Sequence, residues 1–267
     1  MPTFVSINPF VALSNMVPTV ALQGFLIAMA ALTVGGVLLD IMHKKNVKYF
    51  FENAKKAKEK ATSHVSTGKK AKIIVETVAH DVLTSGEFCG WKRRVAHLLG
   101  MYGTIIFWVT SAILIFKYAT PTTSNTPEII SQLWHLGAAM TCLGAYWFWF
   151  FLRVDLASEG NKWYRVVFAD LFVLSLVITS TFGLAWSYLQ AEGSAWSNLF
   201  LVLFIFSNIV LFGGVYWSKF AHMFYKPGAA IQKNLAEADG SRDGLPEPAD
   251  APKQFGLGIK REAPRHY

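Results

Sequence analysis

The stretch SNLFLVLFIFSNIVLFGGVYWSKF, residues 197–220, decides the fold class. It carries no charged side chain before Lys219, and about 20 apolar residues in a helix are enough to cross the ~30 Å hydrocarbon core of a bilayer. Four further apolar runs lie at 17–39, 95–116, 129–152 and 166–189. Because lipid offers no hydrogen-bond partners to a bare backbone, each run is expected to be a helix. We therefore predict an all-α, polytopic membrane protein, built as a bundle of five transmembrane helices.

The positive charges predict the orientation of this bundle. The chain has 25 Lys and Arg residues and a net charge of +8. If all five runs span the membrane, every Lys and Arg except Lys117 lies on one side. Positive residues stay on the cytoplasmic side, so we expect the N-terminus outside and the C-terminus inside. Such a basic face suits anionic lipid headgroups or an acidic soluble partner, and charge that follows the membrane face does not favour nucleic-acid binding.

Three parts are expected along the chain. Residues 1–16 are apolar and uncharged and are expected to lie in the outer interface. Residues 17–233 form the five-helix membrane domain, which includes the basic loop 43–94 with 13 Lys and Arg against five acids. Residues 234–267 become rich in Pro, Gly and charge and are expected to form a flexible cytoplasmic tail. The 43–94 loop is either a solvated segment that sets the topology or a docking surface for a partner.

Two histidines are expected at the inner ends of two helices. His97 lies about one turn inside the second run, and His222 lies at the inner end of the fifth. A histidine at membrane depth costs free energy unless something uses it. Two imidazoles on neighbouring helices can hold one haem iron from both faces, and Arg93 and Arg94 would then neutralise the haem propionates. The alternative is that each histidine is an interfacial residue that holds no metal.

Four other titratable residues are candidates for the same chemistry. His43 and His80 are reserve ligands on the inner side, where either could replace a haem ligand or bond a propionate. His135, near the outer end of the third run, is either a hydrogen-bonding histidine or a quinone contact. Asp170, an acid within the fourth run, is either a proton acceptor in quinone chemistry or part of a salt bridge. The candidate salt-bridge partners are Arg153, Arg165 and Lys219.

Several motifs taken together resemble a known family. They are His80-Asp-Val-Leu, Arg93-Arg-Val-Ala-His97-Leu-Leu-Gly-Met-Tyr-Gly103, Asp170-Leu-Phe and Ser218-Lys-Phe-Ala-His222-Met-Phe-Tyr. This set resembles the cytochrome b domain of respiratory membrane subunits. Examples are the gamma subunit of nitrate reductase and the membrane subunit of the quinone-interacting oxidoreductase of sulfate reducers. The resemblance covers roughly residues 17–233. It is closest to the membrane anchor associated with adenylylsulfate reductase in sulfur-oxidising bacteria.

The resemblance implies one haem b rather than two. The family places two haem ligands on its second helix and two on its fifth, and His97 and His222 match the inner pair. Phe107 and Phe204 stand where the outer pair would be, ten residues after His97 and eighteen before His222. Only the inner haem is therefore expected.

The resemblance also implies a role for the chain. It would anchor a soluble iron–sulfur flavoprotein, adenylylsulfate reductase or a similar enzyme, on the cytoplasmic face of a bacterial inner membrane. Electrons would pass through the haem to ubiquinone or menaquinone. The chain has two cysteines and no nucleotide-binding motif, so no catalytic residue is expected in it. One alternative function is a haem-free scaffold that only docks the partner, and another is a proton-coupled transporter that uses Asp170.

Overall fold

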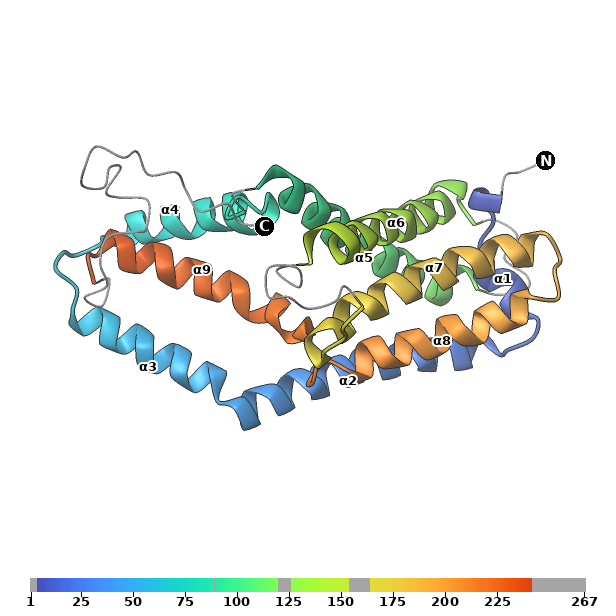
Figure 1. Ribbon diagram of the computed structural model, residues 1–267, viewed down its shortest axis with the longest axis horizontal. Helices are drawn as coiled ribbons and strands as arrows, with labels where there is room; N and C mark the ends of the chain where they lie inside the picture. The colour runs from blue at the N-terminus through green and yellow to red at the C-terminus, as the bar shows by residue number, and fades with distance from the viewer. Residues whose placement is uncertain (1–3, 89, 120–125, 154–163, 242–267) are drawn as a thin grey trace. The chain divides into compact units, whose positions relative to one another are not determined.

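The computed structural model describes residues 4–88, 90–119, 126–153 and 164–241, which are helical without any strand among them (Figure 1). Four helical segments in these ranges are long and apolar enough to cross a membrane. They are Thr19–Lys44, Trp91–Tyr118, Glu128–Leu152 and Phe168–Ala191. The prediction of an all-α protein with several membrane-crossing helices is confirmed at this level.

The fifth apolar run forms a shorter helix than the sequence predicts. Helix α8 (Ser197–Gly213) has 17 residues, so it is about 25 Å long at 1.5 Å per residue. The amides of Trp217 and Ser218 both bond to the carbonyl of Gly214, at 3.1 and 2.8 Å, and this turns the chain. The short helix η5 (Lys219–Ala221) and helix α9 (His222–Ala238) follow. Glycine has a low helix propensity that a hydropathy pattern does not register, so the pair at Gly213–Gly214 is where the run breaks.

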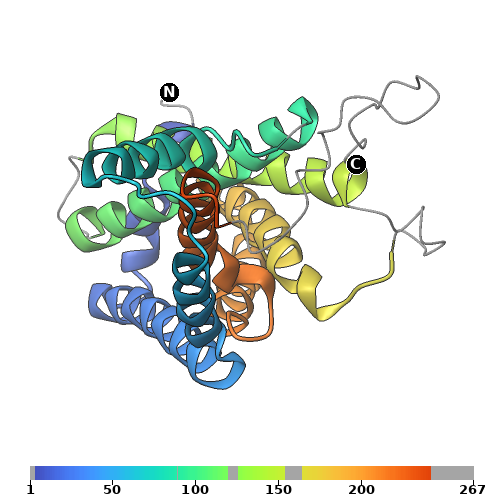
Figure 2. The same ribbon diagram turned by 90° about the vertical axis from the view of Figure 1, so that its left-hand side faces the viewer.

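The contacts divide the chain into two compact units. Unit 1 comprises residues 1–40 and 95–221, and unit 2 comprises residues 41–94 and 222–267. In unit 1, α7 lies side by side with α8 in both views (Figures 1 and 2) and also contacts α6. The membrane-length elements that contribute to unit 1 are α2 (Thr19–Lys44), α5 (Trp91–Tyr118), α6 (Glu128–Trp147) with η3 (Phe148–Leu152), and η4 (Phe168–Asp170) with α7 (Leu171–Ala191).

Helices α5 and α6 approach closely because glycines face each other along their contact. A Cβ atom placed at Gly144 would lie 2.6 Å from the backbone nitrogen of Gly100, and one at Gly103 would lie 2.5 Å from that of Thr141. A Cβ atom at Gly137 would lie 2.6 Å from the backbone nitrogen of Phe107. Small residues of this kind let two membrane helices pack backbone against backbone, which strengthens dispersion contacts where lipid offers no hydrophobic driving force.

Aromatic rings from four helices fill the core of unit 1. Phe107, Trp134, Trp186 and Phe204 are each at most 9% exposed. The ring centroids of Phe107 and Trp134 are 5.0 Å apart, those of Trp186 and Phe204 are 5.7 Å apart, and those of Phe107 and Phe204 are 6.2 Å apart. The two phenylalanines that stand at the outer-ligand positions of the resembling family are therefore packed core residues in this chain.

The N-terminal segment packs against this core. It contains η1 (Phe4–Ser6) and α1 (Pro9–Ser14), and the side chain of Asn8 caps α1 by accepting a hydrogen bond from the amide of Phe10 at 3.0 Å. Phe10 is 4% exposed, and its ring lies 5.8 Å from that of Trp134 and 5.6 Å from that of Trp186. Residues expected in the outer interface thus form part of the aromatic core of unit 1.

Unit 2 is a helical assembly made from two distant segments of the chain. Helices α3 (Asn46–Glu59) and α4 (Thr67–Thr77) both contact α9, and α4 continues as the π-helix η2 (Val78–Leu83). Asn234 of α9 donates hydrogen bonds to Thr77 at 2.8 Å and to Asp81 at 3.0 Å. Helix α9 continues to Ala238, whereas the sequence places the start of the tail at 234. The rest of that predicted tail, 242–267, lies outside the described residues.

Candidate functional site

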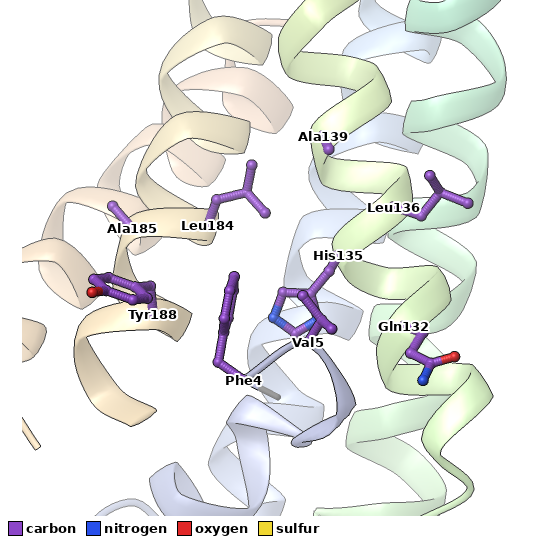
Figure 3. A pocket seen from close by; sticks show the side chains of 9 residues that line it. All are labelled: Phe4, Val5, Gln132, His135, Leu136, Ala139, Leu184, Ala185 and Tyr188. Atoms are coloured by element: carbon purple, nitrogen blue, oxygen red, sulfur yellow. The ribbon is translucent and has the colours of Figure 1, made fainter. Parts of the chain in front are cut away.

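An open hollow of about 620 Å³ lies between α6 and α7, and η1 forms one of its walls (Figure 3). Every lining element belongs to unit 1. The lining is apolar apart from three side chains, those of Gln132, His135 and Tyr188, so the hollow suits a small apolar molecule with few polar groups. The lining residues are Phe4 and Val5 of η1, Gln132, His135, Leu136 and Ala139 of α6, and Leu184, Ala185 and Tyr188 of α7.

His135 is fixed by hydrogen bonds at both ring nitrogens. Its Nδ1 lies 2.8 Å from the carbonyl oxygen of Ser131, and its Nε2 lies 2.7 Å from the hydroxyl of Ser187 on α7. A carbonyl can only accept, so Nδ1 carries the hydrogen, and in the neutral ring Nε2 accepts from the Ser187 hydroxyl. The side chain is 4% exposed. His135 therefore ties α6 to α7 and presents an aromatic wall to the hollow, which agrees with the hydrogen-bonding alternative.

The ring of Phe4 stands between His135 and Tyr188 (Figure 3). It meets both rings edge-on, with centroid distances of 5.4 Å to His135 and 5.5 Å to Tyr188. The Nε2 of Gln132 donates a hydrogen bond to the hydroxyl of Ser6 at 3.2 Å, in an exposed position. These contacts hold η1 against the hollow.

Asp170 forms an ion pair with Arg153. The Nε of Arg153 donates to Asp170 at 3.1 Å and its Nη2 donates to the other carboxylate oxygen. The same carboxylate accepts the amide of Val167 at 2.9 Å, and the Arg153 guanidinium lies 3.9 Å from the ring centroid of Trp149. Asp170 therefore forms the salt bridge that was one of its two predicted roles, and Arg153 is its partner among the three candidates. Both guanidinium branches and one backbone amide therefore hold the carboxylate in place.

His97 is half-buried on α5, and a Cβ atom added at Gly100, one turn further along, would meet no atom within 4 Å. Arg94 donates to the carbonyl of Thr84 at 2.7 Å and to its hydroxyl at 2.9 Å, so Arg94 already holds the segment before α5. His97 lies in unit 1 and His222 in unit 2, and the side chain of His222 lies outside the described residues. Their pairing stays a prediction.

The chain that leads to His222 packs on α5 at a level far from His97. Phe220, two residues before His222, stacks on Trp108 with a centroid distance of 5.8 Å and an interplanar angle of 10°. Trp108 lies eleven residues beyond His97, which is about 16 Å along the helix.

The two reserve ligands lie in unit 2. His43 is exposed in the last turn of α2. His80 lies in η2, where its Nδ1 pairs with Asp81 at 2.9 Å and its ring covers Gly86, whose added Cβ atom would come within 2.3 Å of that nitrogen. The hydrogen bond from His80 holds the pKa of Asp81 below its ordinary value of 3.8. π-helical turns within α-helices are frequent at functional sites.

The structure joins some of the predicted residues to partners that sequence reasoning missed. His135 meets Ser187, Phe4 and Tyr188, and none of these partners belongs to a recognisable motif. The apolar N-terminal residues were the one available signal, because such a segment needs an apolar surface to cover. Within the described parts of the chain, no cluster of three or more His, Cys, Asp or Glu side chains is arranged to hold a metal ion.

Comparison of this chain with protein-family models, with curated proteins and with solved structures gives no match.

Proposed function

We propose that the chain is the membrane anchor and electron-transfer subunit of a quinone-linked oxidoreductase in a bacterial inner membrane. In this proposal, five helices cross the bilayer, with the N-terminus outside and the C-terminus inside. The catalytic partner is a cytoplasmic iron–sulfur flavoprotein similar to adenylylsulfate reductase. The observation that carries the proposal is that one chain combines membrane-length helices with a folded, lysine-rich unit 2.

The lysines of unit 2 form the proposed docking surface. The lysines of α3 and α4 are exposed, and Lys48 and Lys72 each pair with an acid of their own helix, at 3.6 and 3.7 Å. Because α9 contacts both helices, the charges sit on an ordered assembly. Exposed charges of one sign speed the association of an oppositely charged protein and fix its register, and salt screens them. We therefore expect the partner to present an acidic face to these lysines.

In the same proposal, His97 and His222 hold one haem b, and Arg93 and Arg94 lie on the side of its propionates. Haem bound there would carry single electrons between the partner and the quinone. The part of the chain in unit 1 keeps His97 half-buried beside the open space at Gly100. Partial burial of this kind reduces the access of water, which tunes the potential of a haem iron.

The proposal is tested on the purified protein and on its complex. A reduced-minus-oxidised spectrum of b type is expected, and it should disappear in His97→Ala and in His222→Ala but persist in the control His64→Ala, whose side chain is exposed. Replacing Lys55, Lys56 and Lys58 by Gln should abolish co-purification of adenylylsulfate reductase, whereas Lys117→Gln should not. A purified protein that shows no haem absorbance and does not retain the partner contradicts the whole proposal.

A second candidate function is the haem-free scaffold, in which the lysine-rich unit 2 only docks the partner near the membrane. The scaffold predicts retained co-purification without haem absorbance. The ion pair with Arg153 occupies the carboxylate of Asp170. This does not favour a proton-coupled transporter that uses Asp170 as its proton site.

A further inference from the structure

We infer that the hollow between α6 and α7 binds the ring of a quinone and that η1 is its displaceable cover. The inference deepens the proposed function, since it gives the proposed quinone a place on this chain. It is carried by the geometry around Phe4, His135 and Gln132, all within unit 1 (Figure 3).

The size and the lining of the hollow match this ligand class. Pockets that bury small molecules usually enclose about 300–1,000 Å³ and combine apolar walls with a few polar groups. The hollow encloses about 620 Å³, with Leu136, Ala139, Leu184 and Ala185 among its apolar walls. A quinone has the same character, because it is a flat apolar ring with two carbonyl oxygens and an apolar tail.

Two kinds of contact that η1 makes in the hollow can be replaced by a quinone. The ring of Phe4 lies between His135 and Tyr188, nearly perpendicular to both rings, and another flat ring can take that place. The hydroxyl of Ser6 accepts from Gln132 at 3.2 Å, and a quinone carbonyl can accept the same hydrogen. Displacing η1 also removes the hydrogen bond between the Val5 backbone and His135, but the buried ring keeps Ser131 and Ser187 as partners, which limits the cost of such an exchange.

The chain is built so that η1 can move while α1 stays in place. None of the residues of η1 is buried, whereas Phe10 and Leu13 of α1 are each 4% exposed and contact the aromatic core. Gln190 donates a hydrogen bond to the carbonyl of Pro9 at 2.8 Å and so fixes the start of α1. Ile7, between the two elements, is 41% exposed. Motion of Phe4–Ser6 therefore needs no disruption of the core.

His135 acts here as a positioning residue. With both nitrogens bonded to Ser131 and Ser187, its ring keeps one orientation and offers a fixed wall to the ligand ring. The bond to Ser187 also sets the separation of α6 and α7, and so the width of the hollow. His135→Phe keeps an aromatic wall but removes the bond, so it should weaken quinone binding without abolishing it.

The test uses the full chain in nanodiscs without any partner, labelled by an azido-ubiquinone under light and mapped by mass spectrometry. Labelling is expected in the peptides that contain Phe4, Gln132 and Tyr188. Filling the hollow by Ala185→Phe should lower this labelling about tenfold, equivalent to about 1.4 kcal/mol. Removing the ring between His135 and Tyr188 by Phe4→Ala should raise the labelling. Leu143→Phe, on an exposed position of α6, is the matched control and should change nothing.

A competition experiment distinguishes binding of a quinone ring from binding of an apolar chain. Excess decylubiquinone should remove the labelling, and decylbenzene at the same concentration should not. Equal competition by the two compounds would mean that any lipid tail occupies the hollow, and this overturns the inference. Labelling spread evenly over the exposed faces of α2 and α6 overturns it too. The haem spectrum and partner retention of the same protein report on the proposed function separately.

Discussion

The contact between α5 and α6 provides a sharp quantitative test of the fold. Replacing Gly137 by Ala places a Cβ atom 2.6 Å from the backbone nitrogen of Phe107 and 3.0 Å from its Cα. Ordinary contact begins near 3.4 Å, so the helices must separate by about 0.8 Å at this point, since a backbone atom cannot turn aside. Overpacking of this size typically costs about 1–3 kcal/mol. The separation also weakens dispersion contacts along the pair, including those of Trp134 with Phe107.

The control is Gly100→Ala in the same helix pair, where the added Cβ atom meets nothing within 4 Å. Both variants gain the same helix propensity, about 1 kcal/mol, so the difference between them isolates the clash. Unfolding in mixed micelles with increasing dodecyl sulfate, followed by circular dichroism, gives the free energy of each. We expect Gly137→Ala to be less stable than Gly100→Ala by about 1–3 kcal/mol. Equal stability of the two variants would refute the close packing of α5 and α6.

Three further changes probe the ion pair and unit 2. Arg153→Ala leaves the Asp170 carboxylate without its charged partner and should cost about 3–5 kcal/mol in the same assay; adding Asp170→Asn should recover part of this loss. The folded pKa of Asp81 is depressed by His80, so its stabilising effect is present above the unfolded pKa near 3.8 and lost as pH falls through the lower folded pKa. The protection factors of the α4 amides should therefore fall at acid pH in the native protein, and Asp81→Asn should flatten this fall. Asn234→Leu removes the hydrogen bonds to Thr77 of α4 and to Asp81 of η2 and should raise the exchange rate of α4 at neutral pH, whereas that of α7 should not change.

The sequence predicted the membrane-length helices well because their signal is local. An uncharged apolar run of sufficient length must be helical in lipid, whatever lies beside it. The same reasoning missed the end of α8, because Gly213 and Gly214 are neutral in hydropathy and yet favour a turn. The sequence pattern also did not predict unit 2, where α9 contacts α3 and α4 through individual hydrogen bonds such as that from Asn234 to Thr77. Contacts between segments so distant leave no periodicity along the chain.

The candidate residues followed the same division. Asp170 was recognisable as a residue that needs a partner, since a carboxylate in an apolar run is costly, and Arg153 was among the three named. His135 was recognisable for the same reason, but Ser187 lies 52 residues further along and has no feature that marks it. The role of Phe4 was beyond sequence reasoning altogether. An exposed phenylalanine and one that stands between two rings look alike until the fold places α6 beside α7.

The haem proposal and the quinone proposal depend on different parts of the fold. The hollow at His135 is made by α6, α7 and η1, and its hydrogen bonds all lie within unit 1. The haem proposal depends on the turn after Gly214, because that turn decides where the chain beyond Phe220 begins. A quinone could therefore bind at Phe4 and His135 in a protein without haem. In that case the partner's own clusters would have to reach the quinone, and the aromatic core of Phe107, Trp134, Trp186 and Phe204 would be only a packed support for the hollow.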